Sequence, residues 1–224
     1  MLLRIFGCLL VSFPFIAHAQ VPSAIGERLE QGESLSIVTY GTSLTAGGGW
    51  VRQVEQSLER KFPGQVKIIN AAKGGMNSDW GVKNLDERVL ANKPDVVFIE
   101  FAVNDAVERF HIPVLHARRN LVSMIERIRR LNPKTEIILQ VTNPVIDRPK
   151  GHDGYRPELE EMFAMVREVA KEQKTVLIDH EDAWKRELHA GLEHYHELVP
   201  DGLHPNDGAY ARIITPVILS AIGQ

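Results

Sequence analysis

Five short apolar segments alternate along the chain with longer amphipathic ones, and this alternation constrains the fold more than any other feature. The apolar segments are rich in β-branched residues and predict strands over Ser36–Tyr40, Val66–Asn70, Asp95–Phe101, Glu136–Thr142 and Thr175–Asp179. Three- and four-residue apolar spacing predicts helices over Trp50–Phe62, Trp80–Asn92, Val114–Leu131, Pro157–Gln173 and Asn206 to about Ile222. Strict alternation of the two predicts a parallel sheet with helices on both faces, in a flavodoxin-like doubly wound order.

No repeat, low-complexity run or linker divides the chain after residue 19, so we expect residues 20–224 to form a single domain. Two loops look longer than packing requires, Asn143–Tyr155 and Ala190–His204, while Gln20–Glu33 is expected to be a surface approach to the first strand. The net charge of −3 leaves no broad basic field, which argues against a nucleic-acid partner.

The first nineteen residues have the pattern of a secretory signal peptide. Arg4 precedes an apolar run, Ile5–Ala17, that is short for a membrane span, and Ala17-His18-Ala19 before Gln20 is typical of a signal peptidase site. We therefore expect residues 1–19 to be removed from an exported, periplasmic or extracellular protein without stable membrane insertion; a retained anchor is the alternative. Cys8, the only cysteine, lies in this segment, so the mature chain would have no disulfide.

A glycine-containing turn, Gly41-Thr42-Ser43-Leu44, follows the first predicted strand and comes just before a helix. Open α/β sheets bind ligands at the carboxyl ends of their strands, which makes Ser43 a candidate nucleophile. Taken alone, the turn favours a serine that only caps the helix or closes the turn, which is what most serines between a strand and a helix do.

A second pattern near the C-terminus supplies the partners that a nucleophilic serine needs. In Asp201-Gly202-Leu203-His204-Pro205, a carboxylate stands three residues before a histidine on a tight turn. Asp201 can bond one imidazole nitrogen of His204 and leave the other free to accept a proton. With Ser43, these residues fill the three roles of a catalytic triad.

Two further turns offer donors for an oxyanion, the negatively charged oxygen that forms during ester hydrolysis. Gly75 follows the second predicted strand and could present its N–H, and Asn104 follows the third and could present its side-chain amide. With the N–H of Ser43, these groups would make three donors. Each could also be ordinary turn chemistry, because Gly and Asn are turn residues.

These four turns resemble the four sequence blocks of the SGNH hydrolases, the superfamily of GDSL-type esterases and lipases, over nearly the whole chain after the signal. By this resemblance Ser43, Asp201 and His204 form the triad, and Gly75 and Asn104 are oxyanion donors with the Ser43 N–H. The resemblance implies a flavodoxin-like three-layer α/β/α sandwich with a five-stranded parallel sheet. It also implies an esterase, lipase, thioesterase or deacetylase that needs no metal or other cofactor.

The chain departs from the family blocks at two positions. Thr42 stands where the family has aspartate, and we expect its hydroxyl still to hold the turn. Ala102 stands where the family has glycine, which requires backbone angles that suit an L-residue.

We expect a serine esterase that acts on short acyl esters, acetyl above all, of a small molecule or a glycan. A lysophospholipase or thioesterase of the same family is the alternative. We expect four residues of the first long loop to recognise the leaving group: Arg148, Lys150, His152 and Tyr155.

Two other classes of function remain open from the sequence. One is a binding module that has lost catalysis. The other is a metal site, suggested by His189, His194, His196 and His204 with nearby Glu193, Glu197 and Asp201. His189 and His194 lack the four-residue spacing of helical ligand pairs, which favours chance enrichment in a polar loop.

Overall fold

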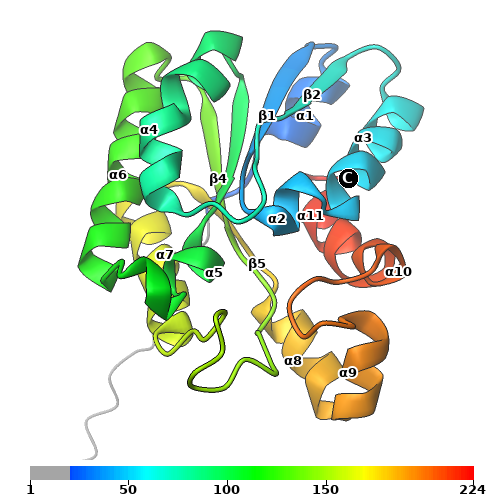
Figure 1. Cartoon of the computed structure of the whole chain (residues 1–224). Helices are drawn as coiled ribbons and strands as arrows, with labels where there is room; N and C mark the ends of the chain where they lie inside the picture. The colour runs from blue at the N-terminus through cyan, green and yellow to red at the C-terminus, as the bar shows by residue number, and fades with distance from the viewer. Residues whose placement is uncertain (1–20) are drawn as a thin grey trace, which may run out of the picture.

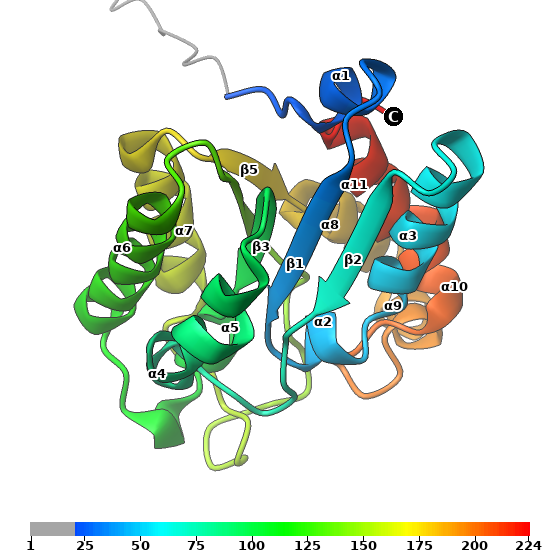
Figure 2. The same ribbon diagram turned by 90° about the horizontal axis from the view of Figure 1, so that it is seen from above.

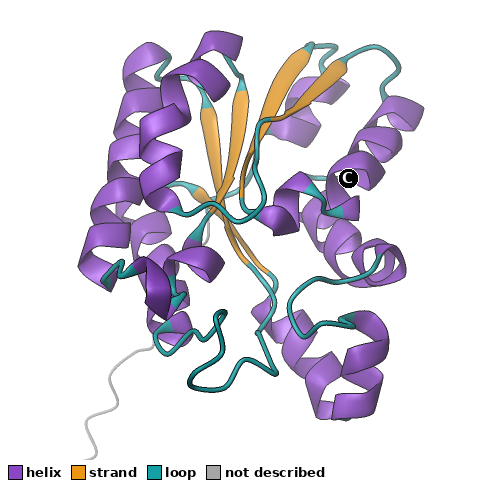
Figure 3. Cartoon of the chain, viewed as in Figure 1, coloured by secondary structure: helices purple, strands orange, loops and turns teal. Residues whose placement is uncertain are grey.

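The structure is a computed structural model that describes residues 21–224 and shows a three-layer α/β/α sandwich (Figure 1). The segment predicted to be a signal peptide, residues 1–19, lies outside the described residues. Five parallel strands form one sheet in the order β2-β1-β3-β4-β5. Figure 3 shows the strands of this sheet with helices on either side. They are β1 (Leu35–Gly41), β2 (Val66–Asn70), β3 (Val96–Glu100), β4 (Glu136–Val141) and β5 (Val176–Asp179). The predicted strands and their parallel arrangement are confirmed, with ends that differ by one residue at most.

Helices cover both faces of the sheet (Figure 2). One face carries α4 (Ser78–Arg88), α6 (Val114–Leu131) and α7 (Leu159–Gln173), and the other carries α1 (Ile25–Glu30), α3 (Gly49–Lys61) and α11 (Thr215–Ala221). Shorter elements lie at the strand ends and in the connections: α2 (Ser43–Ala46), η1 (Leu90–Asn92), α5 (Ala102–Asp105), η2 (Glu108–Phe110), α8 (Glu181–His189), α9 (Leu192–Leu198), α10 (Asp207–Ala209) and η3 (Tyr210–Ile214). Among these helices of residues 21–224, none is both long and apolar enough to cross a bilayer.

The central strand β3 shows why the sheet needs both layers. All five of its residues are buried, and the four apolar ones alternate between two separate cores. Val97 and Ile99 pack with the α4–α6–α7 layer, while Val96 and Phe98 pack with the α3 and α11 layer. A strand buried on both faces reads as a continuous apolar run in sequence, and this run was the signal for a parallel sheet.

The strand order places three turns together at one edge of the sheet. β1 lies between β2 and β3, and its register pairs Thr39 with Asn70 and Gly41 with Glu100. The carboxyl ends of the three strands are therefore adjacent, so the turns that follow them surround a common space. Ligands of doubly wound folds bind at such a point.

Two expectations about loops were wrong. The N-terminal approach Gln20–Glu33 contains helix α1, whose Ile25 and Leu29 are 0% and 1% exposed. The predicted loop Ala190–His204 contains α9, which follows α8 directly. Helices this short gain their stability from packing and not from their own hydrogen bonds, so periodicity alone gave little signal.

The last helical segment is irregular and braces the turn after β1. The predicted helix from Asn206 is confirmed, but it consists of α10, the π turn η3 and α11, with Pro216 at the start of α11. Proline lacks an N–H and disturbs regular helical bonding, which accounts for an irregularity beside it. The Tyr210 hydroxyl, within the π turn, donates a hydrogen bond to the carbonyl oxygen of Leu44 at 3.2 Å.

Candidate active site

Thr42 and Ser43 form the turn between β1 and α2. Thr42 is the N-cap of the helix, and its hydroxyl oxygen accepts a hydrogen bond from the N–H of Leu44 at 3.3 Å. Ser43 is the first helical residue, and its N–H donates no hydrogen bond within the described part of the chain. The expectation that the Thr42 hydroxyl holds this turn is confirmed.

A buried carboxylate from β3 supports the same turn. Glu100 Oε1 accepts hydrogen bonds from the Thr42 N–H, the Thr42 hydroxyl and the Thr45 hydroxyl, each at 2.8 Å. The close approach requires glycine at position 41, because a Cβ there would lie 2.6 Å from Glu100 Oε1. Glu100 thus supplies, from the neighbouring strand, a carboxylate beside the turn in which the SGNH blocks have aspartate and this chain has Thr42.

The environment of Glu100 opposes ionisation. Its side chain is 4% exposed, and burial raises its pKa to about 7 although the hydrogen bonds from Thr42 and Thr45 act in the other direction. The charged form is therefore costly in the folded protein, and it is tolerated only because three donors converge on one oxygen.

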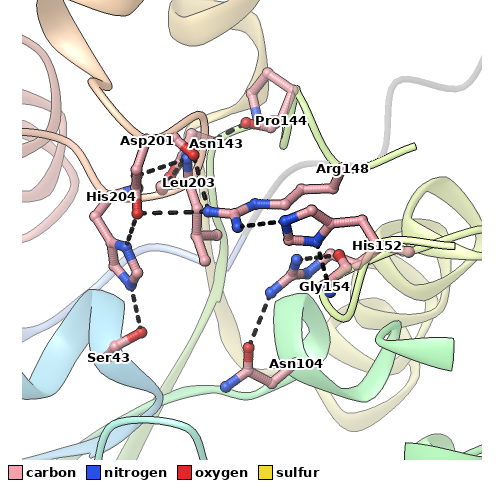
Figure 4. Close-up of polar contacts among 11 residues, drawn as sticks. Ser43, Asn104, Asn143, Pro144, Arg148, His152, Gly154, Asp201, Leu203 and His204 are labelled. Carbon is pink, nitrogen blue, oxygen red and sulfur yellow. Dashed lines mark hydrogen bonds and ion pairs between the residues drawn. The ribbon is translucent and has the colours of Figure 1, made fainter. Parts of the chain in front are cut away.

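The structure brings Ser43, His204 and Asp201 into one chain of hydrogen bonds (Figure 4). Ser43 Oγ lies 2.8 Å from His204 Nε2, and His204 Nδ1 lies 2.7 Å from Asp201 Oδ2. An ionised carboxylate only accepts, so the imidazole proton belongs on Nδ1 and leaves Nε2 as the acceptor for the serine hydroxyl. This is the geometry in which a histidine can remove a proton from a serine.

Asp201 is held in its ionised form. Burial alone would raise its pKa, but hydrogen bonds from the His204 N–H, the His204 ring and the Leu203 N–H outweigh it and lower the pKa to about 2. The two N–H groups donate to Oδ1 at 2.7 and 3.0 Å. The carboxylate therefore stays charged and oriented at neutral pH.

The loop after β4 fixes the turn that carries Asp201 and His204. Asn143 Nδ2 donates to the Leu203 carbonyl oxygen at 2.9 Å, and the Ile146 N–H donates to the Gly202 carbonyl oxygen at 3.0 Å. Gly202 has a φ of +72°, and a Cβ at this position would lie 2.5 Å from the Ile146 oxygen. Only glycine fits here, so the Asp-Gly-Leu-His spacing reflects the close contact of two backbone segments.

The turns that carry the predicted oxyanion donors Gly75 and Asn104 lie at the same edge of the sheet as Ser43. A Cβ on Gly74 would lie 3.6 Å from the Ser43 Cβ, which places this turn directly beside the serine. Gly75 has a φ of +75°, and its N–H has no acceptor within the described residues. Asn104 Nδ2 donates to the Met76 carbonyl oxygen at 2.8 Å, which ties the turn after β3 to the turn after β2 and leaves a second Nδ2 hydrogen.

One neighbour of Asn104, Ala102, meets a sequence expectation, and a second, Asp105, supports the structure. Ala102 opens helix α5 and is not among the described residues with positive φ, so an L-residue is accommodated there. Asp105 is buried and accepts a hydrogen bond from the Ser78 N–H at 2.7 Å, which is a structural role.

Of the four residues expected to recognise the leaving group, Arg148 contacts Asp201, and His152 contacts Arg148. Arg148 Nη2 donates to the Asp201 carbonyl oxygen at 2.8 Å, and His152 Nε2 lies 3.4 Å from Arg148 Nη1 (Figure 4). The side chains of Lys150 and Tyr155 make no hydrogen bond or ion pair with the described part of the chain.

The histidines near the C-terminus do not gather around one point. His194 Nε2 lies 2.7 Å from Glu187, and His196 Nε2 lies 3.2 Å from Asp147. Within residues 21–224, no three His, Cys, Asp or Glu side chains converge as metal ligands would.

Two residues of the site were missed from the sequence. Glu100 had a usable signal, since after Asp95 it is the only charged residue of the predicted strand Asp95–Phe101 and stands near its carboxyl end. Arg156, whose Nη2 donates to Asn104 Oδ1 at 3.3 Å, had none, because it is one of several charges in a polar loop.

Comparison with known proteins decides the family. The sequence model of the GDSL-like lipase/acylhydrolase family matches residues 35–212, from the start of β1 to η3. This chain belongs to that family. The predicted resemblance is therefore confirmed, and the match includes each of the turns described above.

Relatives of this GDSL-like chain include Esterase TesA of Pseudomonas aeruginosa, 26% identical over 96% of this chain and 94% of its own length. A GDSL esterase/lipase of Arabidopsis thaliana (At5g62930) is 27% identical, and this chain spans about half of that protein, 52% of its length. Among solved structures, the acetylxylan esterase Axe2 of Geobacillus stearothermophilus is 21% identical with a TM-score of 0.72, covering 86% of this chain and 95% of that one. At this identity the structural likeness supports the fold alone.

The buried Glu100 gives this GDSL-like protein a testable pH dependence of stability. Because its pKa rises from 4.5 unfolded to about 7 folded, the folded protein keeps a proton that the unfolded chain has lost, and stability falls as pH rises through this interval. Glu100→Gln removes this contribution. Relative to wild type, its unfolding free energy should rise by on the order of 3 kcal/mol between pH 4.5 and 7. Urea unfolding across this range measures the difference, and a difference that stays constant with pH would contradict the account.

Proposed function

We propose that this protein is a serine esterase in which Ser43 is the nucleophile, His204 the general base and Asp201 the group that orients the histidine. The observation that carries the proposal is the unbroken chain of hydrogen bonds from Ser43 Oγ through the imidazole to the Asp201 carboxylate, 2.8 and 2.7 Å long. Membership of the GDSL-like lipase/acylhydrolase family supports the same chemistry.

In the proposed reaction, His204 Nε2 takes the Ser43 proton while Ser43 Oγ attacks the ester carbonyl carbon. The tetrahedral intermediate collapses to an acyl-enzyme as the protonated imidazole gives its proton to the departing alcohol. Water then attacks the acyl-enzyme with His204 again as base, which releases the acid and restores Ser43. Asp201, with its pKa lowered to about 2, stays ionised throughout and stabilises the imidazolium.

The oxyanion of both tetrahedral intermediates would be held by the N–H groups of Ser43 and Gly75 and by the Asn104 side-chain amide. The two N–H groups have no other acceptor within the described residues, and Asn104 keeps one amide hydrogen available. Donors that are already in place cost no reorganisation during the reaction, and losing one typically lowers the rate by about 10²–10³.

For the substrate we propose a short acyl ester, acetyl above all, carried by a small molecule or a glycan. The name of the structural neighbour Axe2, an acetylxylan esterase, supports this class. A polar loop that brings Arg148 and His152 beside the triad suits an alcohol with many hydroxyl groups. Lys150 and Tyr155 extend the same loop, and we assign all four residues to leaving-group recognition.

A series of p-nitrophenyl esters tests this proposal. We expect kcat/KM to be highest for acetate, lower for butyrate and lowest for decanoate, because the proposed site takes a short acyl group. A preference for decanoate would contradict the short-acyl assignment and favour a lysophospholipase or thioesterase.

Ser43→Ala provides the matched control for the same assay. With the nucleophile removed, turnover on all three esters should fall by roughly 10⁴–10⁶, while circular dichroism and the Tm remain those of the wild type. Ser57→Ala, on the distant helix α3, should leave turnover unchanged. Activity of Ser43→Ala near that of wild type would show that another residue is the nucleophile.

We also propose export, with residues 1–19 as a cleaved signal peptide. The support is the basic start, the apolar run and the Ala17-His18-Ala19 pattern. Expression of the full chain in a bacterium, followed by N-terminal sequencing of the exported fraction, should give Gln20 as the first residue. Recovery of the chain in the membrane with Met1 retained would contradict cleavage and indicate an anchor.

A further inference from the structure

Asn104 can act as an oxyanion donor only with its NH2 group, and not its oxygen, turned toward Ser43. Two contacts set this orientation: Nδ2 donates to the Met76 carbonyl oxygen at 2.8 Å, and Oδ1 accepts from Arg156 Nη2 at 3.3 Å. Rotating the amide by 180° would set the NH2 group against guanidinium donors and the amide oxygen against a carbonyl oxygen. Both contacts therefore favour the orientation that the proposed chemistry needs.

Arg156 is itself held rigidly between two segments. Its Nε donates to the Val103 carbonyl oxygen and its Nη1 to the Gly154 carbonyl oxygen, both at 2.6 Å. The planar guanidinium thus joins the loop after β4 to the turn after β3, and its third contact falls on the Asn104 amide. A flat group with donors in a fixed fork can satisfy three such directions at once.

The charge of Arg156 has no carboxylate partner. None of the ion pairs within residues 21–224 includes it, and all three of its acceptors are uncharged oxygens. Burial, followed by the neighbouring Arg148 and Arg109, lowers its pKa to about 10, so it remains charged at neutral pH. A half-buried cation that only bonds carbonyl oxygens is a poor stabiliser of the fold, but it polarises an amide whose oxygen it contacts and strengthens that amide as a donor.

We propose that Arg156 is a positioning residue for the oxyanion site: it fixes the Asn104 amide with its NH2 group toward Ser43 and polarises it. This inference rests on the proposed esterase function and adds a residue that none of the four sequence blocks contains. Arg156 acts through Asn104 and makes no contact with the reacting atoms.

The first test compares Arg156→Met with wild type on p-nitrophenyl acetate. Losing a whole oxyanion donor costs about 10²–10³ in rate, and a donor that is present but free to turn should cost part of this, about 10–100-fold in kcat with KM changed less than about threefold. Arg109→Met is the matched control, because Arg109 is a nearby cation that stacks over Phe110 and does not contact Asn104. Its kcat should stay within about twofold of the wild-type value.

A double-mutant comparison separates positioning from a general structural effect. If Arg156 works through Asn104, adding Arg156→Met to Asn104→Ala should lower kcat by less than about threefold further. An equal fold-loss in both backgrounds would overturn the inference. So would a wild-type kcat in Arg156→Met, or a loss confined to KM, which would make Arg156 a substrate-binding residue.

Arg156→Lys and a spectroscopic measurement complete the test. Lysine keeps the charge but cannot reproduce the planar set of donors, so the kcat of Arg156→Lys should fall clearly below that of wild type; full activity would overturn the inference.

In ¹H–¹⁵N spectra the Asn104 side-chain NH2 signals, assigned with Asn104→Asp, should shift or broaden in Arg156→Met and stay in place in Arg109→Met. Unchanged signals would overturn it as well. If the wild type itself hydrolyses no ester, the proposed function fails, and that outcome is distinct from each of these.

Discussion

The hydrogen bond between Ser43 and His204 joins residues 161 positions apart. The fold must therefore bring two distant turns of the chain together. A parallel sheet places the turns after β1, β2 and β3 at one edge. The strand order alone therefore brings Ser43, Gly75 and Asn104 to the same edge. His204 comes from a turn outside the sheet, so other contacts must hold it in place. The loop after β4 makes these contacts, because it forms hydrogen bonds with the backbone of the Asp201–His204 turn.

The site is supported by two carboxyl groups, the buried Glu100 and the more exposed Asp201, whose ionisation is set by burial and by local hydrogen bonds. Glu100 is removed from water, yet three donors from Thr42 and Thr45 converge on one of its oxygens, so this carboxyl group holds the turn that carries Ser43. Asp201 has the opposite balance, because its hydrogen bonds outweigh burial and keep it charged. The carboxyl group beside the Thr42–Ser43 turn therefore resists ionisation, whereas the carboxylate bonded to His204 stays ionised at neutral pH.

Sequence alone could predict the sheet, because strands buried on both faces are continuous apolar runs. It could predict the turns after β1, β2 and β3, because each follows such a run, and the Asp201–His204 turn from the spacing of its carboxylate and imidazole. It could not predict α8 and α9, since helices of this length depend on contacts such as the edge-on packing of Trp184 against Tyr195. Arg156 was also beyond reach. One arginine in a charged loop looks like any other until the fold shows that its guanidinium lies on Asn104. Glu100, in contrast, was visible as a lone charge ending a buried strand, and its meaning was missed.

The central claim is that His204 makes the Ser43 hydroxyl nucleophilic, and covalent labelling tests it most directly. Wild-type protein treated with a fluorophosphonate, digested and analysed by mass spectrometry should carry one adduct, on the peptide containing Ser43. His204→Ala should react more slowly by roughly 10³-fold or more, because the base that removes the serine proton is gone. An adduct on a different residue, or labelling of His204→Ala at the wild-type rate, would contradict the account.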